Sequence, residues 1–479
     1  MSNVIKENEI EIEKPVEEII NSFPGYEFVY DENDKKYHNI YKGEDVGFGG
    51  YVWALPGLYG RTVCFDVSGM HPASIRALNC FGEYTKNFGD IVDARLAIKH
   101  KDFESARKML DGKLAPYLDD ESKANDLAKA LKIAVNSVYG LTAANFSNPF
   151  RDIRNKNNIV ALRGALFMVD LKQELQNRGC TVIHCKTDSI KVVEPDAETT
   201  NFIMEYGKKY GYSFEIEHIF EKICLVNDAV YIAKLASDDP DKPGNWTATG
   251  AQFQIPYTFK TLFSKEPIEF DDLCVTKEVK TALYLDMNET LPDVNEYEEL
   301  KTIREKQTED LTKKEQLMLE NFNYITDEEL DELISKGHSY QFVGKVGSFC
   351  PIKSGCGGGL LLREKDGKYY AATGTKGYRW LESESVKSLG KEDDIDYSYH
   401  ISLANDAIEA ISEYGDFDWF VSDDNVDYPP WKRECGRDTC AGCSEFVADN
   451  DDIDCKLGYD ISDVKLMSEP IDDNIFEKR

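Results

Sequence analysis

Two aspartates stand where strand-forming segments end, and both could bind a divalent metal ion. Asp66 interrupts the apolar run 62–67, which predicts a buried strand. A carboxylate inside such a strand is destabilising unless it is paired, hydrogen-bonded or bound to metal. Asp188 lies in the polar tetrapeptide KTDS, between the strand formers of Thr181–Val193. This pattern predicts a β-hairpin with Asp188 at its tip. For both residues, a turn or capping role is the structural alternative.

Two predicted helices lie between these aspartates. The first, residues 89–110, carries Arg95 and Lys99 four positions apart on one face. The second covers residues 121–140, and three of its residues share one side: Lys132, Asn136 and Tyr139. Each cation alone could be a solvated surface residue, but cations on two antiparallel helices could together hold a triphosphate.

Paired carboxylates and clustered cations have a shared chemical use. Two carboxylates that hold divalent metals, with cations for a triphosphate, form the minimal set for nucleotidyl transfer. One Mg²⁺ would activate the attacking hydroxyl, and a second Mg²⁺ would stabilise the leaving pyrophosphate.

The composition is that of a folded protein, with 42% hydrophobic and 11% aromatic residues in a chain of 479. The net charge of −32 opposes nucleic-acid binding only as an average, because residues 391–479 alone hold 25 acidic against 8 basic residues. No apolar run approaches the ~20 residues of a membrane span. The acidic N-terminus resembles no signal or transit peptide, so we expect a cytoplasmic protein. Most of the 12 cysteines are scattered singly, as is typical of reduced core residues.

Two segments resemble palm motifs of family B DNA polymerases. FDVSGMHP at 65–72 resembles the first motif, and KTDS at 186–189 resembles the third. The resemblance implies that the metals are bound by Asp66, Val67 and Asp188. It also implies that the incoming nucleotide is contacted by Gly69, Met70 and His71. Glu217 resembles a nearby acidic residue of the family and is a candidate third ligand; a solvent-facing Glu on an alternating strand is the alternative.

The segment KIAVNSVYG at 132–140 resembles the fingers motif of the same family. The resemblance implies that Lys132 contacts the triphosphate and that Asn136 and Tyr139 pack at the nascent base pair. Arg95 and Lys99 match the basic pair on the family's other fingers helix.

Other segments resemble the family's DNA contacts. GFGG at 47–50 resembles its template-binding Gly-Gly turn, and AVYIAK at 229–234 resembles a degenerate primer-end segment. KGYRW at 376–380 mixes cations with aromatic residues, which suits a nucleic-acid backbone. The residues expected to bind DNA are Gly49, Gly50, Thr187, Tyr231, Lys376, Tyr378 and Arg379.

The resemblance covers roughly residues 40–240 and is nearest to polymerases of tailed bacteriophages. It implies an α+β right-hand fold with an antiparallel palm sheet, two-helix fingers, a mixed thumb and an acidic tail. The expected parts are a leading segment (1–45), the palm (46–80 and 151–245), the fingers (81–150), the thumb (246–420) and the tail (421–479).

The sequence departs from the family pattern at several places. Lys186 stands where the family usually has an acid, and Ala229 lies near a lost primer-end Lys. His71 replaces the Tyr that usually excludes ribonucleotides, although an imidazole can still act as a steric gate. Residues 1–60 are too few for a 3′–5′ exonuclease, so we expect proofreading to be absent or carried by another chain. The interval 140–181 is too short for the insertion of protein-primed polymerases.

The tail carries a separate cysteine pattern. Cys435, Cys440 and Cys443 have the spacing C-x4-C-x2-C, and Cys455 could be a fourth ligand. Such spacing suggests Zn²⁺ in a cytoplasmic chain; free cysteines in an acidic loop are the alternative.

Together these features predict a template-directed DNA polymerase that uses two Mg²⁺ ions, dNTPs and primer–template DNA. A separate exonuclease or accessory chain is an expected partner. The alternative is a non-catalytic, polymerase-like subunit that binds primer–template or a partner chain. Lys186 and the lost primer-end Lys motivate that alternative, whereas the presence of both Asp66 and Asp188 opposes it.

Overall fold

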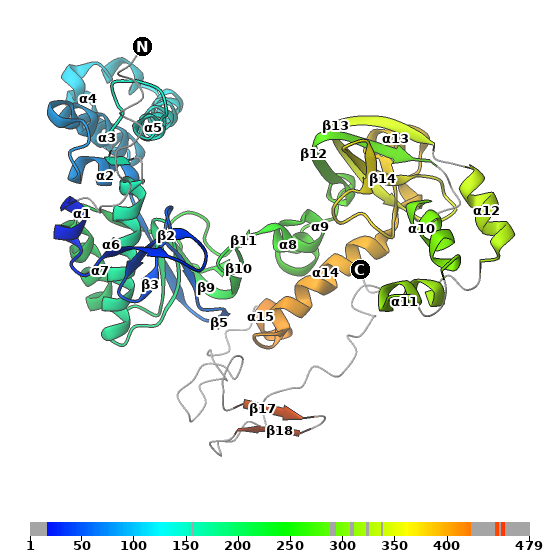
Figure 1. Cartoon of the computed structure of the whole chain (residues 1–479). Coiled ribbons are helices and arrows are strands. Elements are labelled where there is room, and N and C mark those ends of the chain that lie inside the picture. Colours follow the sequence, from blue (N-terminus) through cyan, green and yellow to red (C-terminus); the bar gives the residue numbers. More distant parts are fainter. Residues whose placement is uncertain are drawn as a thin grey trace, which may run out of the picture. The chain divides into compact units, whose positions relative to one another are not determined.

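The chain forms two compact units, each with its own core (Figure 1). The computed structural model describes residues 17–152, 154–155, 158–287, 294–306, 311–321, 325–336, 339–422, 446–449 and 452–455. The first unit comprises Met1–Gly250 and Ile411–Arg479, and the second comprises Ala251–Ala410. No helix among the described residues is long and apolar enough to cross a membrane.

An antiparallel sheet is the base of the first unit. Among the described residues, eight strands form it in the order β11-β10-β9-β6-β8-β7-β4, with β5 also paired to β9. Its strands are β4 (Val52–Ala54), β5 (Gly57–Tyr59), β6 (Thr62–Val67), β7 (Val182–Lys186), β8 (Ser189–Val193), β9 (Phe214–Asn227), β10 (Val230–Leu235) and β11 (Trp246–Thr249). The predicted strand at 62–67 and the hairpin at 181–193 are both confirmed.

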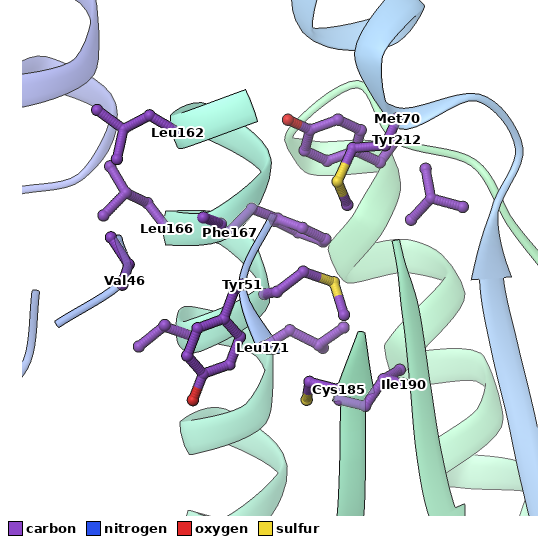
Figure 2. Close-up of a cluster of buried hydrophobic side chains, with 14 of the residues drawn as sticks. Val46, Tyr51, Met70, Leu162, Leu166, Phe167, Leu171, Cys185, Ile190 and Tyr212 are labelled. Atoms are coloured by element: carbon purple, nitrogen blue, oxygen red, sulfur yellow. The ribbon is translucent and has the colours of Figure 1, made fainter. Parts of the chain in front are cut away.

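A buried helix, α6 (Ile159–Asn177), anchors the sheet. Its Ala, Leu and Met content favours helix, and it ends before Gly179, which has a left-handed φ of 83°. Figure 2 shows Phe167 and Leu171 pointing from α6 toward Cys185 and Ile190 on β7 and β8. Leu162 and Leu166 project from the other side of α6, near Val46. Because α6 has apolar residues on both sides, it packs against the sheet on one side and against the segment around Val46 on the other, within one continuous core.

Smaller elements of the first unit surround this core. They are α1 (Glu17–Ser22), the three-stranded sheet of β1 (Glu27–Asp31), β2 (Lys36–Tyr41) and β3 (Glu44–Asp45), α7 (Ala197–Lys209), α15 (Phe417–Val421), β17 (Phe446–Asp449) and β18 (Asp452–Cys455).

Among the described residues between β6 and α6, the α-helices are α2 (Met70–Ala77), α3 (Thr85–Lys99), α4 (Phe103–Lys108) and α5 (Glu121–Thr142). The predicted single helix at 89–110 is wrong. Lys101 adopts a left-handed φ of 60°, and the Asp102 side chain accepts a hydrogen bond from Ser105 N at 3.1 Å. This N-cap starts a new helix, α4. The second helix is confirmed as α5 and packs beside α3 through Ala94, Ile98 and Ala124.

In its described residues, the second unit combines a five-stranded antiparallel sheet with helices. Its strands, in the order β15-β14-β12-β13-β16, are β12 (Val275–Asp286), β13 (Tyr340–Ile352), β14 (Leu360–Lys365), β15 (Lys368–Ala371) and β16 (Arg379–Glu382). Its helices are α8 (Ala251–Gln254), α9 (Pro256–Phe259), α10 (Val294–Arg304), α11 (Lys313–Asn321), α12 (Asp327–Lys336), α13 (Ser383–Leu389) and α14 (Tyr397–Ser412), the last of which ends in the first unit. The α+β class expected from the sequence is confirmed.

The Gly49-Gly50 turn lies against the tip of the β7–β8 hairpin. Thr187 N donates a hydrogen bond to Tyr51 O at 2.8 Å. A Cβ added to Gly50 would lie 2.5 Å from Thr187 Oγ1, whereas one added to Gly49 would meet nothing within 4 Å. Gly50 therefore permits a close approach to the chain's own hairpin; its contact with a template stays a prediction.

Because of this close approach, Gly50 and its neighbour Gly49 should differ in how well they tolerate a side chain. Gly50→Ala should lower the free energy of unfolding by about 1–3 kcal/mol, because the new methyl group displaces Thr187. Gly49→Ala should change it by less than about 1 kcal/mol. Urea unfolding of both variants measures the difference, and equal effects would contradict the packing described here.

Candidate active site

A cavity of about 600 Å³ opens in the first unit where β6, α2, α3, α5, the β7–β8 hairpin and β9 meet. It brings together most of the metal and nucleotide residues expected from the sequence. Those that line it are Asp66, Val67, Gly69, Met70, His71, Arg95, Lys99, Lys132, Asn136, Asp188 and Glu217. The most distant of these residues in the sequence, Asp66 and Glu217, are 151 positions apart. Only the folded chain brings them together.

Strand register places the two aspartates at one end of the sheet. β6 pairs with β8 so that Asp66 is opposite Ser189, and Val67 N donates to Asp188 O at 2.8 Å. Thr187 has a left-handed φ of 55°, which makes the tight turn before Asp188. On its other edge, β6 pairs with β9 so that Asp66 is opposite Glu215. Asp66 is therefore held between two acidic neighbours.

The carboxylates of the cavity repel one another. Burial, followed by repulsion from Asp188, Glu217 and Glu215, raises the pKa of Asp66 to about 7. Burial and then Glu217 raise the pKa of Asp188. A divalent cation would relieve this repulsion, and carboxylate oxygens are the hard ligands that Mg²⁺ prefers. The residues present at this site therefore fit Mg²⁺.

The cations of α3 and α5 face these acids across the cavity. Arg95 and Lys99 lie one turn apart on α3, and Lys132 is exposed on α5. Burial lowers the pKa of Arg95, while Glu215 opposes that shift. Lys99 forms an ion pair with Glu215, and His100 Nε2 lies 3.1 Å from the second Glu215 oxygen.

His71 and Tyr139 form an aromatic wall. Their ring centroids are 4.4 Å apart, although Tyr139 does not itself line the cavity. Tyr139 Oη donates to Asn158 Oδ1 at 2.9 Å, and Asn158 Nδ2 donates to Phe48 O at 2.7 Å. Burial lowers the pKa of His71, so its imidazole is neutral at pH 7.

Sequence reasoning missed Glu215, which lines the cavity beside Glu217. The signal was present, because Glu215 and Glu217 are two residues apart on a strand and so share one face. Burial tends to raise the pKa of Glu215, but hydrogen bonds from Lys99 and His100 hold that pKa below its ordinary value.

A buried cation, Lys191, was also missed. It is only 4% exposed, and its Nζ donates to His184 Nδ1 at 3.2 Å. His184 Nε2 donates in turn to Asp228 O at 3.1 Å, which fixes the tautomer. Burial and then the charge of Lys191 lower the pKa of His184 to about 4, so this imidazole is neutral. The Lys191 ammonium also lies 5.1 Å from the ring centroid of Tyr231.

The remaining expected residues lie outside the cavity. Gly49, Gly50 and Thr187 are beside it at the hairpin tip, and Tyr231 is on β10. The second unit holds Lys376, Tyr378 and Arg379; Tyr378 packs on Tyr399 with ring centroids 5.0 Å apart, and Arg379 donates to Gly358 O at 2.7 Å. Lys186 ends β7 and does not line the cavity.

The zinc prediction concerns residues outside the described ranges. Cys435, Cys440 and Cys443 lie there, and so does the side chain of Cys455, whose backbone ends β18. Within the described part of the chain, the cysteines are free thiols.

The raised pKa of Asp66 predicts a link between stability and pH. The folded pKa of about 7 exceeds the ~4 of an unfolded aspartate, so Asp66 favours folding at low pH. This contribution is lost as the pH rises from about 4 through 7. With EDTA at pH 8, Asp66→Asn should be more stable than the wild type by about 1–2 kcal/mol after allowance for solvent screening.

Urea unfolding at pH 8 and pH 4 measures this effect, and the gain should disappear at pH 4. Asp238 is the matched control, because its hydrogen bonds with Arg61 lower its pKa. Asp238→Asn should therefore give no gain at pH 8. A destabilised Asp66→Asn variant in EDTA would contradict the repulsion described above.

Known proteins offer limited similarity to this chain. No protein-family model matches the sequence, and no curated protein matches it. The structure is similar to that of the family B DNA polymerase from the hyperthermophilic archaeon Pyrobaculum calidifontis, with a TM-score of 0.39 and 12% sequence identity. The match covers 83% of this chain and 50% of that polymerase, so the chain spans about half of its length.

Proposed function

We propose that the first unit catalyses template-directed addition of dNTPs to a primer 3′-hydroxyl. One observation carries this proposal: a single cavity gathers two partly buried carboxylates, Asp66 and Asp188, with three cations, Arg95, Lys99 and Lys132. This is the charge arrangement that transfer from a metal-bound triphosphate requires. A pair of carboxylates without nearby cations could bind a metal ion, but it would offer no groups to hold a triphosphate.

In this proposal Asp66 and Asp188, with the backbone of Val67, hold two Mg²⁺ ions, and Glu217 is a candidate further ligand. When bound, Mg²⁺ supplies charge neutralisation on the triphosphate and a lower pKa for the primer hydroxyl. The chain's own cations orient the triphosphate, since guanidinium and ammonium groups bind phosphate oxygens tightly. The first amides of α2, at Met70 and His71 after the left-handed Gly69, are available to the same phosphates.

The sugar and base of the nucleotide would lie against His71, which lines the cavity and has the ring of Tyr139 packed against it. A neutral imidazole presents a flat face without charge, so it can exclude a 2′-hydroxyl sterically while Asn136 lies beside the base. We assign the steric gate to His71 on this basis.

DNA contacts complete the proposal. Gly49, Gly50 and Thr187 at the hairpin tip would face the template, and Tyr231 would face the primer end. We propose the second unit as a thumb with Lys376, Tyr378 and Arg379 on the DNA backbone. The whole would be a phage-type polymerase module of palm, two-helix fingers and thumb, with Zn²⁺ in the tail.

A non-catalytic primer–template-binding subunit is the second candidate. It is favoured by the ion pair that already occupies Lys99, and by the presence of a cation, Lys186, two residues before Asp188 in the sequence. The two candidates differ in the role of Asp66 and Asp188. A polymerase needs both carboxylates for nucleotide addition, whereas a binding subunit does not need them for catalysis.

Primer extension with Mg²⁺ separates these candidates. Asp66→Ala and Asp188→Ala should each reduce extension by at least about 10³-fold, because the metals lose a ligand. Asp238→Ala removes an exposed aspartate outside the cavity and should retain wild-type activity. Full extension by the Asp66 or Asp188 variants would reject the catalytic role, and absence of extension by the wild type with Mg²⁺ would favour the second candidate.

The triphosphate role of Lys132 can be tested against a neighbour on the same helix. Lys132→Ala should raise the KM for dNTP roughly 10- to 100-fold, the effect of losing one charge-assisted contact. Lys129→Ala should leave KM unchanged, because Lys129 is exposed, lies off the cavity and pairs with Asp126. Steady-state extension at varied dNTP concentration measures both values, and similar KM values for the two variants would contradict the assignment.

A further inference from the structure

One acid of the cavity is bound to a cation that the proposed function needs for another purpose. Glu215 reaches from β9 to the end of α3, where one oxygen pairs with Lys99 and the other lies 3.1 Å from His100 Nε2. Both Glu215 and Lys99 line the cavity. The pair therefore joins the acidic strand side of the site to its cationic helix side.

The position of Glu215 is set by strand pairing. It is opposite Asp66 in the β6–β9 register, so its backbone cannot move without moving the proposed metal site. Lys99 is the last residue of α3 and His100 is its C-cap. The contact is thus a side-chain bridge between two well-anchored backbones, and it can break without unfolding either element.

The bridge is accessible and weak enough to exchange. The Lys99 side chain is 42% exposed and that of Glu215 is 29% exposed. Ion pairs with this degree of solvent contact contribute little to stability. A polyphosphate carries several negative charges and offers more acceptor oxygens than one carboxylate, so it can replace Glu215 as the partner of Lys99.

We propose that Glu215 is an internal competitor for the polyphosphate of the nucleotide. Without ligand, its carboxylate occupies Lys99 and His100; a bound triphosphate displaces it, and Lys99 returns to Glu215 when pyrophosphate leaves. Glu215 thus lowers the affinity for triphosphate and pyrophosphate alike and favours product release. This inference rests on the proposed function, because it assumes that a triphosphate binds in this cavity.

Competition and simple charge repulsion predict different results for two substitutions. Glu215→Gln removes the charge, so both explanations predict tighter polyphosphate binding. Glu215→Asp keeps the charge but shortens the side chain by one methylene, which weakens the bridge to Lys99. Only competition predicts that Glu215→Asp also binds polyphosphate more tightly.

The experiment is calorimetric titration of the full chain, in Mg²⁺, with a non-hydrolysable dNTP analogue and separately with inorganic pyrophosphate. We expect Kd to fall about 2- to 5-fold for both Glu215 variants, the factor that corresponds to releasing one exposed ion pair. Glu205→Gln is the matched control, because Glu205 pairs with Lys208 at 2.7 Å on α7, outside the cavity. It should leave Kd unchanged.

The outcomes distinguish the inference from the function on which it rests. Binding by the wild type with unchanged or weaker binding by Glu215→Asp overturns the competitor role and leaves the proposed function standing. No binding of either probe by the folded wild type overturns the proposed function, and the inference with it. Tighter binding by both Glu215 variants supports the inference, and the two substitutions guard against a local folding defect in one of them.

Discussion

Repulsion among carboxylates at one end of a sheet is the constraint on which this molecule depends. The register of β6 against β8 and β9 places Asp66 between Asp188 and Glu215, with Glu217 on the same face. Such a cluster opposes folding at neutral pH unless a cation joins it. The folded state therefore contains unfavourable repulsion between carboxylates, which metal or ligand binding would relieve. Such perturbed groups are common at functional sites.

The rest of the first unit supplies the rigidity and the compensating charge that this cluster requires. Helix α6 is buried along most of its length and fixes the strands from inside the core. Helices α3 and α5 pack on each other through small apolar residues and carry Arg95, Lys99 and Lys132 to the cavity. Lys191 adds a buried cation to the sheet, and its Nζ donates to the neutral His184.

Local patterns were enough to predict the strands, the hairpin and α5, because apolar runs, turn residues and caps act over short distances. They failed at 89–110, where the apolar pattern continues across the break and Asp102 was not recognised as an N-cap. Glu215 and Glu217 share one strand face, but only the pairing of β9 with β6 places that face at the cavity. Lys191 is charged yet buried, because its ammonium contacts His184 on the paired strand β7 and the ring of Tyr231 on β10. Register and enclosure are tertiary properties, and no local signal carries them.

The most direct test of the account is the location of bound metal. Crystals soaked with Mn²⁺ and a non-hydrolysable dNTP analogue would be measured at a wavelength where manganese scatters anomalously. The account predicts two anomalous peaks, each about 2–2.5 Å from a carboxylate oxygen of Asp66 or Asp188. An ordered analogue with no manganese at these two carboxylates, or with manganese only elsewhere, would contradict it.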